Sequence, residues 1–209
     1  MPQLPVAREG LPFVLIPGAL AALLALGGRR RLALPFAAAS LASLGFFRDP
    51  ERVTPMAPHG VIAPADGRVT IVDEREDPFV GPAQRVSIFL SPFDVHVTRS
   101  PISGVVVGTV RTSGRFLPAY RPEAGEENEQ CAVHIEGGGM RVTVVQVAGV
   151  AARRVVCRVG AGDKLAAGER FGIIRFGSRT DCMMPRSAQV LVQPGDRVKG
   201  GETVIGMLT

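Results

Sequence analysis

Two apolar stretches follow each other at the start of the chain, and they limit most strongly what it can fold into. They cover residues 11–28 and 32–47, and the cluster Arg29-Arg30-Arg31 separates them. As helices they would be about 27 Å and about 24 Å long, against a bilayer hydrocarbon core of about 30 Å. We therefore expect an apolar helical hairpin over residues 1–47 that associates with a membrane.

The way this hairpin meets a membrane stays open. Two full spans would put the arginine loop on the cytoplasmic side and the rest of the chain outside, by the positive-inside rule. A hairpin that dips into one leaflet, with the arginines among the headgroups, avoids this conflict. A buried hairpin of a soluble protein is the other alternative. We favour a peripheral or monotopic protein of the cell membrane, with residues 48–209 on the cytoplasmic side.

From residue 48 onward, short apolar alternations are separated by Gly, Pro and Asp. Strand candidates cover 61–62, 69–72, 86–90, 104–110, 132–135, 142–147 and 154–159. Turn signals at such short intervals are typical of β-sandwiches and barrels. The predicted fold class is mainly β, with a barrel-sandwich-hybrid-like body over 48–209 behind the hairpin. The polar stretch 113–130 is predicted to be a long surface loop and a candidate substrate lid.

A short internal repeat supports the β assignment. Residues 162–169 (GDKLAAGE) match residues 195–202 (GDRVKGGE). Glycine and aspartate at fixed offsets are what tight turns between strands require. The form is similar to turns in biotinyl and lipoyl carrier domains, but no lysine stands at a suitable hairpin tip, so a carrier role is disfavoured.

Charge and cysteine content narrow the classes of function. The net charge of +5 comes almost entirely from arginine, which suits an anionic membrane surface or nucleic acid. The low aromatic content, 5% with no Trp, disfavours a platform for single-stranded nucleic acid. Cys131, Cys157 and Cys182 have no metal-ligand spacing, so we expect reduced thiols and no metal site.

Four segments contain the candidate catalytic and binding residues: 46–52 (FFRDPER), 63–69 (APADGRV), 89–97 (FLSPFDVHV) and 176–179 (FGSR). In this order they resemble the phosphatidylserine decarboxylase family in its short form. The resemblance covers nearly the whole chain after Phe46. It implies a self-processing enzyme that cuts its own chain between Gly177 and Ser178, into a large chain of residues 1–177 and a small chain of residues 178–209.

The resemblance also implies the chemistry. Ser178 would become a pyruvoyl group, the covalent cofactor. The amine of phosphatidylserine would join this group as a Schiff base before CO₂ is lost and phosphatidylethanolamine is released. His96 would be the base and proton donor, and Asp66 the acid that orients it. His59 and His134 fall on no motif of the family.

The residue types suit these roles. Glycine before the serine lets the backbone bend, and a serine hydroxyl needs a base to become a good nucleophile. Histidine titrates near neutral pH, and a carboxylate can fix its tautomer.

One position departs from the family pattern. Long-form members carry a second histidine three residues after the one matched by His96, and this chain has Arg99 there. An arginine stays charged and cannot accept the serine proton, so either His96 serves both processing and decarboxylation or another group shares the work. Arg99, Arg111 and Arg115 are candidate contacts for the phosphate or carboxylate of the substrate.

The expected partners are phosphatidylserine in an anionic membrane and the two chains of one precursor. A homodimer stays open, and nucleic acid is not expected. Two other functions stay open as well. One is decarboxylation of a different serine-headed lipid of the archaetidylserine kind, and the other is a non-enzymatic, membrane-tethered barrel-sandwich domain.

Overall fold

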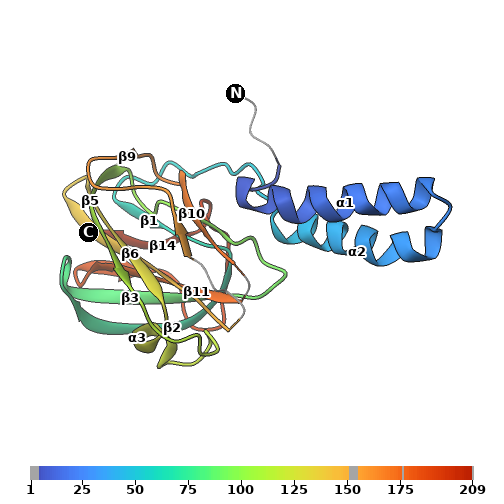
Figure 1. The fold of residues 1–209 in the computed structure, drawn as a ribbon. Helices are drawn as coiled ribbons and strands as arrows, with labels where there is room; N and C mark the ends of the chain where they lie inside the picture. Colours follow the sequence, from blue (N-terminus) through green and yellow to red (C-terminus); the bar gives the residue numbers. More distant parts are fainter. Residues whose placement is uncertain (1–4, 151–154, 176, 209) are drawn as a thin grey trace. The chain divides into compact units, whose positions relative to one another are not determined.

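The computed structural model of the protein describes residues 5–150, 155–175 and 177–208 (Figure 1). The chain divides into two compact units, residues 1–51 and 52–209. Arg154 of one predicted strand and Phe176 of the fourth motif lie outside the described residues.

The first unit is a helical hairpin. It consists of the 3-10 turn η1 (Arg8–Gly10), α1 (Leu11–Leu26) and α2 (Arg30–Phe46), and the two α-helices lie side by side in Figure 1. Small residues line the contact between them, because Ala21 and Ala33 are buried and Ser40 Oγ donates to the Val14 carbonyl at 2.8 Å. The predicted hairpin is confirmed.

The outward surface of this hairpin is apolar. Five of its leucines are 62–87% exposed: Leu15, Leu23, Leu26, Leu34 and Leu41. Apolar surface of this kind is unfavourable in water. By length and composition, the helical run Arg8–Leu26 is able to cross a membrane. The unit therefore presents a surface that suits contact with lipid.

The second unit is built of antiparallel strands. An eight-stranded sheet has the order β13-β2-β3-β11-β7-β6-β5-β9, and two three-stranded sheets have the orders β1-β14-β12 and β4-β10-β8. The strands are β1 (Gly60–Ile62), β2 (Gly67–Asp77), β3 (Gly81–Leu90), β4 (Val97–Arg99), β5 (Gly104–Thr112), β6 (Gln130–Gly137), β7 (Met140–Val147), β8 (Val155–Cys157), β9 (Lys164–Leu165), β10 (Arg170–Ile174), β11 (Ser178–Pro185), β12 (Ala188–Val190), β13 (Arg197–Val198) and β14 (Val204–Leu208). Each predicted strand overlaps one of these, and the mainly β fold class is confirmed.

The two copies of the repeat form equivalent turns. The side chains of Asp163 and Asp196 each accept the backbone N–H three residues earlier, at 2.9 Å. Gly168 and Gly201 have φ values of +78° and +81°, in the region that favours glycine. Each turn contains one of the two-residue strands β9 and β13, at the two ends of the eight-stranded sheet. The repeat therefore acts through turn geometry, as predicted.

Strand β11 lies in the middle of the large sheet, between β3 and β7. On one face, Cys182 and Met184 join the main apolar core. On the other face, Arg179 Nε and Nη2 bind the two carboxylate oxygens of Asp181 at 2.6 and 2.7 Å. These two side chains are 1% and 4% exposed, so β11 has a buried ion pair on one face and core on the other.

The segment 113–130 packs against the ion-pair face of β11. Arg179 Nη1 donates to the carbonyls of Arg121 and Pro122 at 3.4 and 3.5 Å. The segment contains the short helix α3 (Ala124–Glu127). Asn128 is fully buried, and its side chain bonds both the N–H and the carbonyl of Leu117 at 2.8 Å. These bonds fix the segment that was predicted as a loop.

Replacing Asp181 with alanine should lower the free energy of unfolding by about 3–5 kcal/mol, because Arg179 would remain as a buried charge without its carboxylate. Urea unfolding followed by circular dichroism in detergent measures this. Glu136→Ala is the matched control, because it removes the partner of the half-exposed Arg141 and should cost at most about 1 kcal/mol. An equally small loss in Asp181→Ala would contradict the role assigned to the buried pair.

Candidate active site

The Gly177–Ser178 junction lies where β11 begins. Ser178 is fully buried and stands opposite Leu90 of β3. Gly177 has a φ of +57°, a left-handed conformation that other residues adopt only at a cost. The backbone therefore changes from a left-handed turn to an extended strand across the bond at which the family resemblance predicts cleavage.

A second glycine lies against the carbonyl of this junction. A Cβ at Gly149 would overlap the Gly177 oxygen and come within 3.3 Å of Ala119 Cβ. The neighbouring Ala148 carbonyl accepts a hydrogen bond from Asn128 Nδ2 at 2.7 Å. The turn after β7 and the segment 113–130 are therefore held together beside the Gly177 carbonyl.

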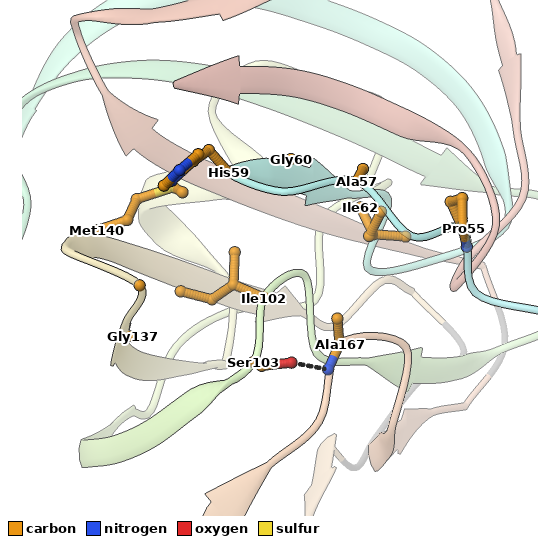
Figure 2. Close-up of a pocket in the computed structure, with 11 residues that line it drawn as sticks. Pro55, Ala57, His59, Gly60, Ile62, Ile102, Ser103, Gly137, Met140 and Ala167 are labelled. Atoms are coloured by element: carbon orange, nitrogen blue, oxygen red, sulfur yellow. Dashed lines mark hydrogen bonds between the residues drawn. The ribbon is translucent and has the colours of Figure 1, made fainter. Parts of the chain in front are cut away.

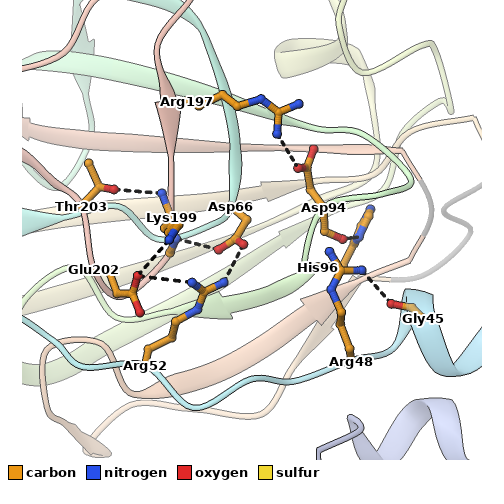
Figure 3. A network of polar contacts seen from close by, with 11 residues as sticks. Gly45, Arg48, Arg52, Asp66, Asp94, His96, Arg197, Lys199, Glu202 and Thr203 are labelled. Carbon is orange, nitrogen blue, oxygen red and sulfur yellow. Dashed lines mark hydrogen bonds and ion pairs between the residues drawn. The ribbon is translucent and has the colours of Figure 1, made fainter.

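The loop between β3 and β4 sets the tautomer of His96. The Asp94 carboxylate accepts from Ser91 N and Oγ at 2.8 and 2.6 Å and lies 3.5 Å from Arg197 Nη1 (Figure 3). In the loop held this way, the Asp94 carbonyl is 2.9 Å from His96 Nδ1. A carbonyl can only accept, so Nδ1 carries the proton and the neutral ring has its lone pair on Nε2. Nε2 is therefore the basic atom of His96.

A hydrogen bond joins β4 to the middle of the large sheet, close in sequence to His96 and Ser178. Gln146 of β7 stands opposite Thr180 of β11, and its Nε2 donates to Thr98 Oγ1 of β4 at 2.9 Å. Side chains two residues apart along an extended chain share a face. Ser178 precedes Thr180 by two residues, and His96 precedes Thr98 by two. We call these five fully buried residues the inner strip: Ser178, Thr180, Gln146, Thr98 and His96.

Asp66 belongs to an ionic cluster (Figure 3). Its carboxylate accepts from Arg52 Nη2 at 2.7 Å and from Gly200 N at 2.8 Å. Arg52 also donates to Glu202 at 3.3 Å. Among the hydrogen bonds described for Asp66, none goes to the imidazole, so the role predicted for Asp66 stays a prediction. The partner described for His96 is the Asp94 carbonyl.

Electrostatics still couple Asp66 to the site. Burial raises the pKa of the Asp66 carboxyl above its ordinary value, and the charge of Asp94 adds to this rise. Arg52 lowers the same pKa, as do the Gly200 N–H and Arg99. The pKa of Asp66 therefore depends on the charge of Asp94, in the loop before His96, and on the charge of Arg99.

The three predicted substrate arginines have contacts with protein groups. Arg99 is 4% exposed, and its Nη1 donates to the Gly168 carbonyl at 3.1 Å. Arg111 donates to a backbone carbonyl of β8 at 3.4 Å, and Arg115 pairs with Glu127 at 3.2 Å. Arg99 is therefore part of the protein interior, whereas Arg111 and Arg115 remain exposed.

Sequence reasoning missed Gln146, Thr180 and Arg179. All three are fully buried polar residues on central strands. The available signal was the alternation along β7, where Val142 and Val144 place Gln146 on the core-facing side. A polar side chain at a core position usually has a specific partner or function.

A cavity of about 210 Å³ lies elsewhere in the second unit (Figure 2). Among the residues that the structure describes, none of those predicted for the site lines it. Its side chains are mostly apolar, and Ser103 Oγ already accepts from Ala167 N at 2.9 Å. The cavity therefore brings no predicted site residue near His59 among the residues that line it. The lining residues are Pro55, Ala57, His59, Gly60, Ile62, Ile102, Ser103, Gly137, Gly138, Met140 and Ala167.

Comparison with known proteins gives consistent matches. The model of the family described as phosphatidylserine decarboxylase matches residues 41–206. The phosphatidylserine decarboxylase proenzyme of Symbiobacterium thermophilum is 50% identical over 208 residues, which cover 97% of this chain and 95% of the relative. The proenzyme of Nocardia farcinica is 46% identical, covering 98% and 88%. That of Desulfotalea psychrophila is 40% identical, covering 99% and 98%.

Replacing Gly149 with alanine should slow the cut at Gly177–Ser178 about tenfold or more, equivalent to about 1.4 kcal/mol in the barrier, because the new methyl group displaces the Gly177 carbonyl. Denaturing electrophoresis of timed samples measures the cut. Gly108→Ala is the matched control, because a Cβ there has no atom within 4 Å. A normal rate in Gly149→Ala would contradict the close approach.

Replacing Arg52 with methionine should raise the pKa of Asp66 further, because the largest effect that lowers it is removed. Asp66 would then take up its proton at a higher pH than in the unmodified chain. Carbon-13 NMR titration of the Asp66 carboxyl measures the change. Arg186→Met removes an exposed partner of Glu74 and should leave the titration of Asp66 as it was. An unchanged or lower pKa of Asp66 in Arg52→Met would contradict the lowering effect assigned to Arg52.

Proposed function

The chain belongs to the phosphatidylserine decarboxylase family, and from this premise we propose that it converts phosphatidylserine into phosphatidylethanolamine and CO₂ through a pyruvoyl group made from Ser178. One observation carries the detailed proposal. The Ser178 hydroxyl is fully buried and has no hydrogen-bond partner among the described residues. Ser178 directly follows Gly177, which lies in a turn with a φ of +57°. A buried hydroxyl without a hydrogen-bond partner of its own can act as a nucleophile without first breaking such a bond.

Self-processing would begin at this hydroxyl. His96 Nε2 accepts the proton as Ser178 Oγ bonds to the Gly177 carbonyl carbon. The peptide C–N bond breaks, an ester forms, and the proton passes to the nitrogen of residue 178. A base then takes the Cα proton of residue 178, a Cα=Cβ bond forms, and the bond between Cβ and the ester oxygen breaks, which leaves Gly177 with a carboxylate. Water replaces the nitrogen of residue 178, which departs as ammonia.

The group formed at position 178 supplies a carbonyl that takes up the amine of the lipid and draws electrons from the bond to CO₂. The residues of the chain supply the rest. His96, held by the Asp94 carbonyl, presents Nε2 to hold the proton that the product carbon needs. Arg99 is a fixed charge, so proton transfer rests on His96. Asp66 contributes a negative charge that Arg52 holds in place.

Two features support a lipid substrate. The first unit has an apolar outer surface and a helical run able to cross a membrane, as an enzyme for a bilayer lipid requires. The arginines at 29–31 lie at the turn between its helices and would each gain about 1 kcal/mol near an anionic surface. We propose that the protein is peripheral or monotopic at the cell membrane and acts from the cytoplasmic side.

Strand pairing also supports two chains that stay together after the cut. Residues 178–209 contain β11, β12, β13 and β14. β11 pairs with β3 and β7, β13 with β2, and β14 with β1. The small chain would therefore be held by the backbone hydrogen bonds of four strands of the large chain.

Ser178→Ala should remain one chain without decarboxylase activity, because it lacks the attacking oxygen. His96→Asn should cut more slowly by a factor of about 10²–10⁴, the usual contribution of a positioned base. Intact mass of the purified protein measures both, together with CO₂ release from phosphatidylserine vesicles. Ser87→Ala is the matched control, because Ser87 is an equally buried serine on neighbouring β3 and should be cut normally. An uncut chain through 177 and 178 in active, unmodified protein would overturn the proposal.

A further inference from the structure

On the strands β7 and β11, the inner strip contains three buried polar atoms that bond to no other described residue. They are Ser178 Oγ, Thr180 Oγ1 and Gln146 Oε1, and all three side chains belong to fully buried residues. Buried polar groups are almost always satisfied by protein or by ordered water. Three such atoms in one region therefore point to a polar molecule that binds there.

The register of the sheet brings these atoms together. Thr180 and Gln146 are direct partners across β11 and β7, an arrangement that puts their Cβ atoms about 4.5–5.5 Å apart. Ser178 precedes Thr180 by two residues on the same face of β11. This is the core-facing side, which Cys182 and Val144 share.

The amide of Gln146 is held in one orientation. Its Nε2 donates to Thr98 Oγ1 at 2.9 Å, so its Oε1 is the atom left to accept. Gly172 of β10 makes room for this amide, because a Cβ at that position would lie 2.6 Å from Gln146 Nε2. The acceptor is thus built into the sheet rather than carried by a mobile side chain.

A water molecule matches this set of groups. Buried waters make about three hydrogen bonds, to polar groups that would otherwise be unsatisfied. Gln146 Oε1 accepts from a water, whereas the hydroxyls of Thr180 and Ser178 each donate or accept. Before the cut, these three groups are the number and kind of partners that one water needs. After Oγ has left residue 178 with the Gly177 carboxylate, Thr180 and Gln146 remain to hold it.

We propose that Thr180 and Gln146 bind one water molecule against residue 178, and that this water is the one consumed when residue 178 loses its nitrogen. The proposal rests on the self-processing described above. After the ester opens, residue 178 carries a Cα=Cβ bond and an amino group, and a proton shift converts these into a methyl group and a C=NH bond. The water oxygen then bonds to Cα, and the nitrogen leaves as ammonia with the two water protons. The net exchange of C=NH and H₂O for C=O and NH₃ involves no oxidation.

The positions also explain why the site would need its own water. Residue 178 is fully buried at the start of a central strand, and the segment 113–130 is fixed beside the junction by Asn128. Bulk water has little access to such a carbon. A bound water, held by Thr180 and Gln146 at the carbon that must be hydrated, removes this difficulty.

The test follows the small chain of residues 178–209 in Thr180→Val and Gln146→Leu, expressed as full chains. Both variants should still be cut between Gly177 and Ser178. Conversion of residue 178 to the ketone should be slower about tenfold or more, so a small chain that keeps nitrogen in place of oxygen should accumulate. Borohydride added to timed samples traps the C=NH form as an amine and the ketone as an alcohol, and mass spectrometry of the small chain then separates the two forms.

Two matched variants separate this role from a structural one. Thr180→Ser keeps the hydroxyl and should form the ketone at the normal rate. Ser87→Ala removes a hydroxyl that is also buried and unbonded among described residues, but on the opposite face of the sheet, and it should behave like the unmodified chain. A crystal structure of uncut Ser178→Ala should contain a water within hydrogen-bond distance of Gln146 Oε1 and Thr180 Oγ1.

The outcomes distinguish this inference from the proposed function. An unmodified chain that is never cut would overturn the proposed self-processing itself. Normal cutting with normal ketone formation in both Thr180→Val and Gln146→Leu would overturn only the water site. Loss of the cut itself in both variants, with normal cutting in Thr180→Ser, would assign the two groups to the first attack and would also overturn it. Absence of the water from the crystal structure of Ser178→Ala would also overturn the water site.

Discussion

The candidate site depends on strand β11 being hydrogen-bonded along both edges and buried on both faces. A strand in this position cannot turn its polar side chains toward solvent, so each one must find a partner inside. Arg179 and Asp181 do so by pairing with each other on one face. Ser178 and Thr180 lie on the other face, where their hydroxyls have no described protein partner. The strand that buries Ser178 therefore also leaves its hydroxyl available for the nucleophilic role proposed above.

The two faces of β11 have different electrostatic character. The ion pair on one face anchors the segment 113–130 through the carbonyls of Arg121 and Pro122. Polar but neutral groups, Thr180 and Gln146, surround Ser178 on the other face. The acidic and basic side chains around Asp66 form a separate cluster, and the charges of Asp94 and Arg99 affect the pKa of Asp66. This separation lets charges stabilise the fold while Ser178 shares its face with the neutral side chains of Thr180 and Gln146.

Much of this arrangement could be predicted from the sequence, and the exceptions have physical causes. Apolar length predicted the hairpin, and period-two alternation predicted seven strands. Strand β11 was not predicted, because charged residues such as Arg179 and Asp181 usually indicate an exposed segment. Only their pairing with each other allows them to be buried. The partner of His96 is a backbone carbonyl, and every residue has one, so no sequence pattern marks it. The close approach of Gly149 to Gly177 depends on two turns that are distant in the chain.

The position of the proposed cut relative to β11 gives a physical reason for the chemistry that would follow. Gly177 lies in the turn and the ladder begins at Ser178, so cutting between them leaves the pairing of β11 with β3 and β7 intact. A simple hydrolysis there would create an ammonium group at residue 178, inside a region without described charged partners for the strip. A buried, unpaired ammonium is strongly unfavourable, whereas a ketone is neutral. Loss of the nitrogen as ammonia would thus remove a charge for which Thr180 and Gln146, both neutral, offer no opposite charge, and it would leave a carbonyl on the carbon that carried the nitrogen.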